Sequence, residues 1–260
     1  MSTAVRALEC LGAISLLIQT AEFLRLSPAT TGAGVWYWPV QRNDLAHAAA
    51  PLRKLFDLLF EDAALRAHLW LRLLAAASLF SGSTPFTAAF LFIGGIVMLI
   101  RWRGAFNGGS DFMTLVFTTT LVIGQFAGAV FGAEAAWKAA LWYACIQALT
   151  SYFISGAIKL FSARWRNGHA LTHFLDGGLY GPLPARSAFR TPAVSIACAW
   201  AFILWECAFP FALFGPEWAQ LWCAVAAVFH LLVFRFFGLN RFFWAWITMF
   251  PAIIYCAGQW

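Results

Sequence analysis

The run WKAALWYACIQALTSYFISGAIKLF, residues 137–161, decides the fold class. It is mainly apolar and long enough, as a helix, to cross the hydrocarbon core of a bilayer. Lys159 stands near its end. A lysine in this place is either an anchor whose ammonium group reaches the interface or a reactive base whose charged form is disfavoured by burial. Position alone leaves both interpretations open.

The composition indicates an integral membrane protein. Hydrophobic residues make up 62% of the 260 residues and charged residues 11%, whereas a soluble domain carries about 25% charged residues. The formal net charge of +6 is typical of membrane proteins with basic cytoplasmic loops beside anionic headgroups. We therefore expect the lipid bilayer, and no nucleic acid, as a partner.

We expect an all-α fold, a polytopic bundle of about eight transmembrane helices, with seven and nine as the alternatives. Apolar runs of suitable length predict spans at Ala7–Leu26, Ala67–Gly82, Pro85–Arg101, Phe112–Phe131, Trp137–Phe161, Ala193–Phe214, Trp218–Phe237 and Asn240–Gly258. No internal repeat is found, so residues 1–260 are expected to form one domain.

The segment 51–62, between the first two predicted spans, has the spacing of an amphipathic helix. Its apolar stripe consists of Leu52, Leu55, Phe56, Leu59 and Phe60, and its charged residues lie elsewhere. We expect this helix to lie in the membrane interface or to cap the bundle.

Basic residues gather on one side of the predicted topology. If the spans alternate, that side carries most of the arginines, whereas the opposite side carries only Arg6 and Lys138. The positive-inside rule makes the arginine-rich side cytoplasmic. Alternatively, arginines near Lys159 form a receptor for carboxylate or phosphate groups. The candidate substrate-binding residues are Arg101, Arg103, Arg164, Trp165 and Arg166.

Two ionisable residues lie deep in consecutive predicted spans. Glu206 and His230, counted from the turn between their helices, lie within about 6 Å of each other in depth at 1.5 Å per residue. A buried carboxylate and imidazole at one depth suit a proton relay, and an inert polar clamp between helices is the alternative. The first two spans also contain Glu9, Glu22, His68 and Arg72. Most of these lie close enough to the span ends to reach the interface, and we expect support roles for them.

The segment NGGSD, residues 107–111, opens the fourth predicted span. Ser110 or Asp111 suits an N-cap. Alternatively, the two glycines let a ligand approach the backbone at a helix N-terminus. Asn107, Gly109, Ser110 and Asp111 are therefore candidate cofactor-binding residues.

Metal-ligating patterns are weak in this chain. His169 and His173 share one helical face, but the chain has five histidines in all, fewer than a diiron site of several such pairs requires. The six cysteines lie in apolar stretches and form no CxxC pair. We expect no metal site and no disulfide.

Three groups of residues, in order along the chain, are similar to one membrane-protein family. They are YFISGAIKL (152–160) with Trp165 and Gly168, then Phe229-His230, then GLNRFF (238–243) with Phe250-Pro251. Together they resemble the membrane domain of the vitamin K-dependent γ-carboxylases and their small bacterial relatives, the HTTM (horizontally transferred transmembrane) family. The resemblance extends from about Arg101 to Tyr255.

The resemblance implies a quinol-dependent enzyme in a bacterial inner membrane. Its expected co-substrates are a reduced quinone of the vitamin K or menaquinone type, O2 and carbon dioxide, with epoxidation coupled to modification of a peptide or other acidic substrate. Lys159 falls on the position of the family's catalytic base, which must be a neutral amine to accept a proton. His230 falls on a histidine of the family pattern, and Glu206 is expected to serve with it in proton transfer.

The chain departs from the animal carboxylases in two ways. Their quinone-holding asparagine–histidine pair is not reproduced, because Gly109-Ser110 or Ser110-Asp111 stands in that region. Their large soluble domain has no room in 260 residues, so peptide carboxylation is not carried over. Small bacterial relatives suggest a precursor peptide or an accessory subunit as partner. The alternative function is a non-catalytic membrane binding or maturation partner, or a small-molecule transporter.

Overall fold

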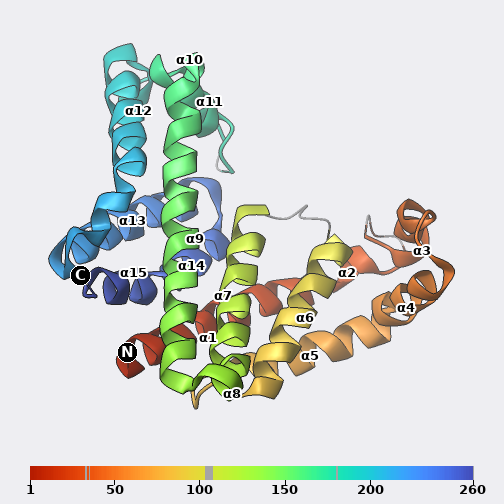
Figure 1. Ribbon diagram of the computed structural model, residues 1–260. Coiled ribbons are helices and arrows are strands. Elements are labelled where there is room, and N and C mark those ends of the chain that lie inside the picture. Colours follow the sequence, from red (N-terminus) through yellow and green to blue (C-terminus); the bar gives the residue numbers. More distant parts are fainter. Residues whose placement is uncertain (33, 35, 103–107, 180, 260) are drawn as a thin grey trace.

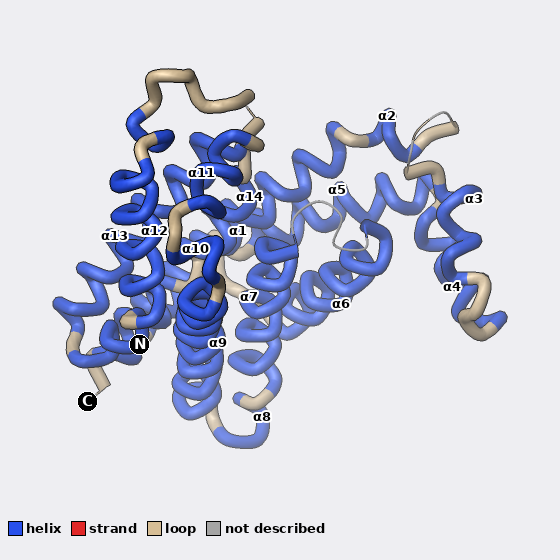
Figure 2. The backbone as a smooth tube through the Cα atoms, turned by 90° about the horizontal axis from the view of Figure 1, so that it is seen from above, coloured by secondary structure: helices blue, strands red, loops and turns tan. Residues whose placement is uncertain are grey.

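The structure is a computed structural model that describes residues 1–32, 34, 36–102, 108–179 and 181–259 (Figure 1). Within these ranges every regular element is a helix, and no strand is present (Figure 2). The helices are α1 (Ser2–Arg25), α2 (Ser27–Thr30), α3 (Trp38–Gln41), η1 (Arg42–Leu45), α4 (Ala50–Phe60), α5 (Asp62–Ser78), α6 (Pro85–Trp102), α7 (Gly108–Phe126), α8 (Gly128–Phe131), α9 (Ala133–Phe161), α10 (Ala163–Arg166), α11 (His169–Asp176), η2 (Ala188–Arg190), α12 (Pro192–Cys207), η3 (Phe209–Phe214), α13 (Pro216–Phe237), α14 (Asn240–Ile247) and α15 (Phe250–Ala257).

The expected all-α fold is confirmed, whereas the count of about eight spans is not. Among the described residues, five helices are long and apolar enough to cross a membrane, at Ser2–Arg25, Pro85–Trp102, Gly109–Phe131, Ala133–Phe161 and Pro216–Phe237. The other three predicted spans are short or broken. The predicted span Ala67–Gly82 corresponds to the shorter helix α5. The span Ala193–Phe214 is divided into α12 and η3, and the span Asn240–Gly258 is divided into α14 and α15.

Proline explains part of this difference. Pro210 lies at the start of η3 and Pro251 at the start of α15. A proline has no backbone N–H to donate and is tolerated only in the first turn of a helix, so each proline begins a new element rather than extending the previous one. Apolar composition alone does not show such breaks.

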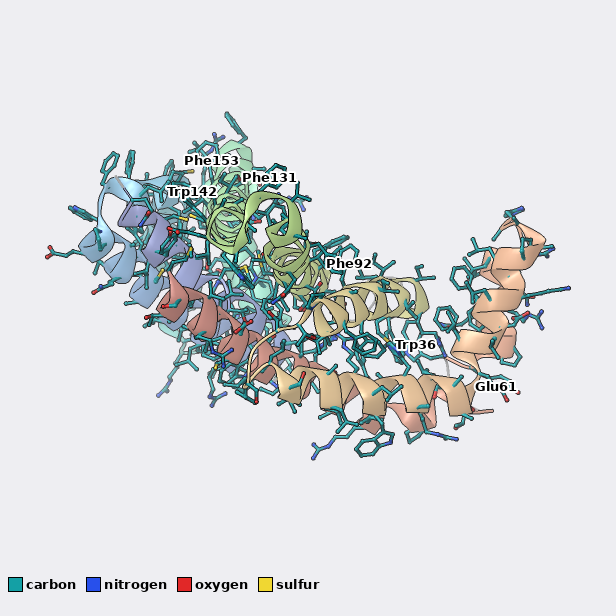
Figure 3. The ribbon with its side chains drawn as sticks, turned by 60° about the horizontal axis from the view of Figure 1, so that its bottom comes forward. Trp36, Glu61, Phe92, Phe131, Trp142 and Phe153 are labelled. Atoms are coloured by element: carbon teal, nitrogen blue, oxygen red, sulfur yellow. The ribbon has the colours of Figure 1, made fainter. Side chains whose placement is uncertain are left out.

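The pair α3–α4 lies at one end of the molecule, where it packs against the end of α6 (Figures 1 and 3). The chain turns at Glu61 into α5. A helix is thus present where the amphipathic segment was expected. Leu52, Leu55 and Leu58 are exposed on it, whereas Phe56 and Phe60 are buried against Trp38.

Helix α9 is the centre of the bundle and packs against α7, α12 and α15. One of its faces carries small residues at four-residue intervals, namely Ala136, Ala140, Ala144 and Ala148, each at most 1% exposed. Small side chains let neighbouring helices approach closely where no hydrophobic effect drives association. Other faces of the bundle display large apolar side chains such as Phe131 and Phe153, as expected for lipid contact (Figure 3).

Candidate active site

A cavity of about 570 Å³ lies among α9, α10, α11, α12, α13 and α14. Its polar groups come from Lys159, Glu206, His230, Tyr152, Ser151 and Ser155, and most of its other lining residues are aromatic or aliphatic. We call it the Lys159 cavity. An apolar pocket of this size with a few convergent polar groups is the usual form of a small-molecule site.

Lys159 and Glu206 form an ion pair in the wall of this cavity. Nζ of Lys159 lies 2.5 and 2.7 Å from the two carboxylate oxygens of Glu206. The lysine side chain is 15% exposed and the glutamate side chain 3% exposed. Nζ also donates a hydrogen bond of 2.6 Å to Oγ of Ser155, which itself donates one of 3.2 Å to Glu206. Lys159 is therefore held by a buried partner and is not a free anchor.

The close approach of α9 and α12 depends on Gly156. A β-carbon built on Gly156 would lie 2.6 Å from the backbone nitrogen of Cys207 and 2.8 Å from Cβ of Glu206. Only the absence of a side chain lets the two backbones approach this closely. Gly156 thus sets the spacing at which Lys159 reaches Glu206 across the two helices.

His230 pairs with Tyr152 and not with Glu206. The Tyr152 hydroxyl lies 2.6 Å from Nε2 of His230, and both side chains are buried. The other ring nitrogen, Nδ1, is buried and has no hydrogen-bond partner among the described residues. The sequence placed Glu206 and His230 at one depth, and both line the same cavity, but each has a different partner.

Aromatic rings surround these polar groups. The Tyr152 ring stacks on Phe209 with centroids 3.8 Å apart, and the His230 ring stacks on Trp246 with centroids 5.1 Å apart. On the other side of the cavity, Nζ of Lys159 lies 5.3 Å from the centroid of the Trp165 ring. Planar walls of this kind favour a flat, mainly apolar ligand.

The predicted substrate-binding residues are separated in the structure. Trp165 lines the Lys159 cavity, and Arg164 and Arg166 are exposed beside it on α10. Arg101 lies elsewhere: it is 1% exposed, hydrogen-bonds to Gln41, and is surrounded by aromatic rings. Arg101 therefore belongs to the packing of α6 and does not form a rim for the cavity. Arg103 lies outside the described residues.

The predicted cofactor-binding segment is also divided. Gly109 lines a separate groove between α7 and α9, and Ser110 is buried at the start of α7. Asp111 points into a cluster of charged residues on the other side of α14 from the Lys159 cavity. Asn107 lies outside the described residues. The structure thus does not bring this segment to Lys159.

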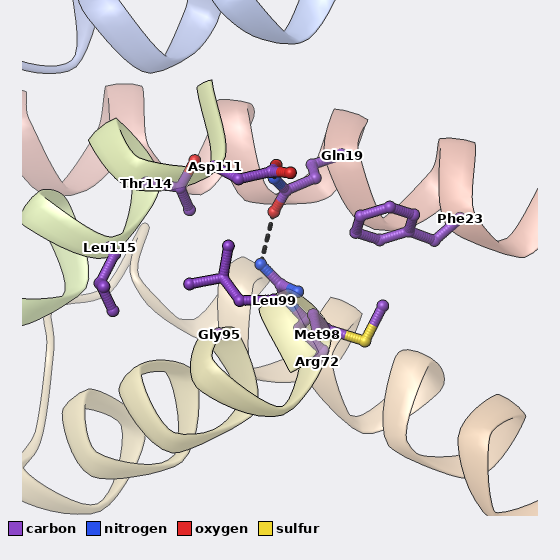
Figure 4. Close-up of a pocket in the computed structure, with 9 residues that line it drawn as sticks. All are labelled: Gln19, Phe23, Arg72, Gly95, Met98, Leu99, Asp111, Thr114 and Leu115. Atoms are coloured by element: carbon purple, nitrogen blue, oxygen red, sulfur yellow. Dashed lines mark hydrogen bonds between the residues drawn. The ribbon is translucent and has the colours of Figure 1, made fainter. Parts of the chain in front are cut away.

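We call the residues around Asp111 the charge cluster, which consists of Glu22, Arg72, Asp111 and Arg241 with Gln19. Figure 4 shows Gln19 with Arg72 and Asp111. Gln19 links two of them, because it accepts a hydrogen bond from Arg72 at 2.5 Å and donates one to Asp111 at 2.9 Å. Arg241 lies 3.4 Å from Asp111 and 3.2 Å from Glu22. The cluster joins α1, α5, α7 and α14 and leaves a cavity of about 20 Å³, room for one water molecule.

Arg72 does not reach an interface, contrary to expectation. Its side chain is 1% exposed, and Nε and Nη1 have no hydrogen-bond partner among the described residues. The two arginines and two carboxylates of the charge cluster balance in charge when all are ionised. This balance explains how Arg72, Asp111 and Arg241 are held inside an apolar bundle, with Glu22, 38% exposed, at its edge.

Comparisons of the chain with protein-family models, with curated proteins and with solved structures found no match. The resemblance to the HTTM family therefore stays a prediction from the residues that carry it.

Sequence reasoning missed Tyr152, Gly156 and Gln19 as site or network residues. Tyr152 had a detectable signal, because Tyr152, Ser155 and Lys159 recur at intervals of three and four residues and so share one helical face. Gly156 had none, because a glycine in a membrane helix is common and only the neighbouring helix shows what it accommodates.

Proposed function

We propose that this chain is a vitamin K-dependent γ-carboxylase-like membrane enzyme of the HTTM type, and that the Lys159 cavity binds a reduced quinone of the vitamin K or menaquinone class. Its reaction is quinol-dependent oxygenation with O2, forming the quinone epoxide. This step is coupled to modification of a peptide or other acidic substrate, for which carbon dioxide is the candidate co-substrate. We place the protein in a bacterial inner membrane.

One observation carries the proposal: a buried lysine–carboxylate pair opens onto a large aromatic-walled cavity inside a membrane bundle. Ionisable groups within membrane helices are costly, and they are usually retained for function. A structural ion pair needs no cavity beside it. Here Lys159 and Glu206 both line a space of about 570 Å³.

The lining of the Lys159 cavity fits a quinol. A reduced quinone supplies a flat apolar ring with hydroxyl groups on opposite sides, two electrons for oxygenation and an acidic proton. Trp165 and Trp246 offer aromatic faces, and the Lys159–Glu206 pair offers a contact for one hydroxyl. Nδ1 of His230, buried without a protein partner, offers a contact for a second polar group. This fit does not require the asparagine–histidine pair that the chain lacks.

The Lys159 and Glu206 side chains together act as one base. The pair holds one proton between Nζ of Lys159 and the Glu206 carboxylate and is neutral in total. When the pair accepts a second proton, Nζ and the carboxyl group are both protonated and the pair carries one positive charge. That charge stabilises an anion in the cavity at a place that excludes water. His230, held by Tyr152, orients the ligand from the opposite wall.

The surroundings of the cavity suit an acidic acceptor. Arg164 and Arg166 are exposed on α10, the helix that carries Trp165 into the cavity wall. Guanidinium groups pair with carboxylates in a planar, bidentate manner. We assign these arginines to recognition of an acidic peptide, either a precursor peptide or a segment of an accessory subunit.

The test is oxygen consumption by the purified protein in lipid nanodiscs supplied with reduced menaquinone or vitamin K, with the quinone followed to its epoxide. Wild type is compared with Lys159→Ala and with Lys138→Ala, a matched lysine at the other end of α9. Loss of a general base typically costs about 10²- to 10⁴-fold in rate, so Lys159→Ala should lose turnover and Lys138→Ala should keep it.

Equal turnover in wild type and a folded Lys159→Ala variant would contradict the assignment of the base. Quinol binding without oxygen consumption in wild type would instead favour a binding or maturation partner or a transporter.

A further inference from the structure

The polar side chains of the Lys159 cavity belong to a longer row on α9. Tyr143, Gln147, Ser151, Ser155 and Lys159 follow one another at four-residue intervals. Residues four apart are neighbours on the helix surface but turn by about 40° at each step, so the row winds partly around α9 as it extends for about 24 Å at 1.5 Å per residue. A polar row of this length is unusual on a membrane-spanning helix, where polar side chains facing lipid are costly.

The N-terminal part of this row, from Tyr143 to Ser151, lines a second space. A groove of about 310 Å³ lies between α7 and α9, and its polar side chains are those of Tyr143, Gln147, Ser151 and Thr119. We call it the α7–α9 groove. Ser151 and Trp246 line both this groove and the Lys159 cavity. The two spaces are therefore neighbours separated by these two side chains.

The side chain of Gln147 needs a polar environment. Gln147 lies midway along α9, is exposed, and its side-chain amide has no hydrogen-bond partner among the described residues. An amide facing lipid tails would lose the hydrogen bonds it makes in water, which is unfavourable. The neighbouring hydroxyls of Ser151 and Thr119 provide the further polar partners that bound water needs.

We propose that the α7–α9 groove is a water-filled side passage that leads along the polar row of α9 to the Lys159–Glu206 pair. Ser155 completes the route, because its hydroxyl hydrogen-bonds to both Lys159 and Glu206. Water in the passage accepts the proton that the pair has gained and returns the pair to its neutral state. The hydration of the groove does not depend on the proposed function, whereas the origin of that proton rests on it.

The test measures access of water to single cysteines, because methanethiosulfonate reagents react with the thiolate and so require hydration. Gln147→Cys and Ser151→Cys are treated with a charged, membrane-impermeant reagent in nanodiscs, in a background whose six native cysteines are replaced by alanine. Ile146→Cys and Phe153→Cys are the matched controls, since Ile146 and Phe153 are 53% and 47% exposed on the same helix.

We expect the two groove positions to react at least tenfold faster than the two controls. Rates at Gln147→Cys and Ser151→Cys no greater than the controls would overturn the proposal, and would mean that a lipid chain or another helix fills the groove. If either groove variant does not fold, Thr119→Cys, on the α7 side of the groove, replaces it. No quinol is present, so the outcome is independent of turnover.

Discussion

Gly156 and Glu206 touch where α9 crosses α12, and a β-carbon on Gly156 would lie 2.8 Å from Cβ of Glu206. The lysine–glutamate pair of the candidate site thus depends on a residue with no side chain. The backbone of Cys207 is equally near, so a side chain at position 156 cannot be accommodated by rotation of the Glu206 side chain alone.

We therefore expect Gly156→Ala to destabilise the protein by about 1–3 kcal/mol, as overpacking of a tight contact does. Gly95→Ala is the matched control, because Gly95 lies inside α6 and a β-carbon there would meet only Oγ1 of Thr118 at 4.0 Å. Unfolding in detergent would measure both. Equal stability of the two variants would show that α9 and α12 adjust freely.

Separating the Lys159–Glu206 pair should be costly. Removal of either partner leaves a buried charge without compensation, and we expect Lys159→Met and Glu206→Gln each to lose about 3–5 kcal/mol. The double variant Lys159→Met with Glu206→Gln should lose less than the sum of the two single losses. The exposed pair Arg190–Asp176 is the control, where a double-mutant cycle should give about 0–1 kcal/mol. Additive losses at Lys159 and Glu206 would argue against the pair.

The Tyr152 hydroxyl is expected to matter for stability. Tyr152→Phe removes the hydrogen bond to Nε2 and leaves both ring nitrogens of His230 without protein partners. An unsatisfied buried polar group costs about 1–3 kcal/mol. Tyr143→Phe, four residues from Gln147 on the same helix, should change stability little, because Tyr143 is only partly buried and lines the α7–α9 groove. Denaturant unfolding of both variants measures this difference.

The charge cluster should be sensitive to loss of one carboxylate. Asp111→Asn leaves Arg72 and Arg241 with too little negative charge around them, and we expect a loss of about 3–5 kcal/mol. Glu217→Gln, an exposed carboxylate at the start of α13, is the control and should have a negligible effect. Thermal unfolding of both would measure the contrast, and equal midpoints would show that the charge cluster contributes little.

Filling the Lys159 cavity should abolish ligand binding without unfolding the chain. Val233→Trp places an indole in the cavity, whereas Val225→Trp places one on the exposed face of the same helix. A ligand at 100 times its Kd stabilises the folded state by about 2.7 kcal/mol. A vitamin K-type quinone should therefore raise the unfolding temperature of wild type and Val225→Trp but not of Val233→Trp. A rise in all three would place the quinone elsewhere.

The sequence by itself determined that this protein is a helical membrane protein, and it marked Lys159, Glu206 and His230. Both results follow from composition along the chain. Long apolar runs can satisfy their backbone hydrogen bonds within a bilayer only as helices, and ionisable residues within such runs are conspicuous because they are costly there. The sequence also gives the depth of a residue within its span, counted from the connecting turn, and for this reason Glu206 and His230 were expected at similar depth.

Only the tertiary structure decided which groups meet. Depth does not give the rotation of a helix about its axis or its crossing angle with a neighbour, and these set whether Glu206 faces Lys159 or His230. The role of Gly156 became visible only with α12 in place, and the pairing of Tyr152 with His230 only with α13 in place. The breaks after α12 and α14 are local by contrast, because Pro210 and Pro251 each begin a new element within an apolar run.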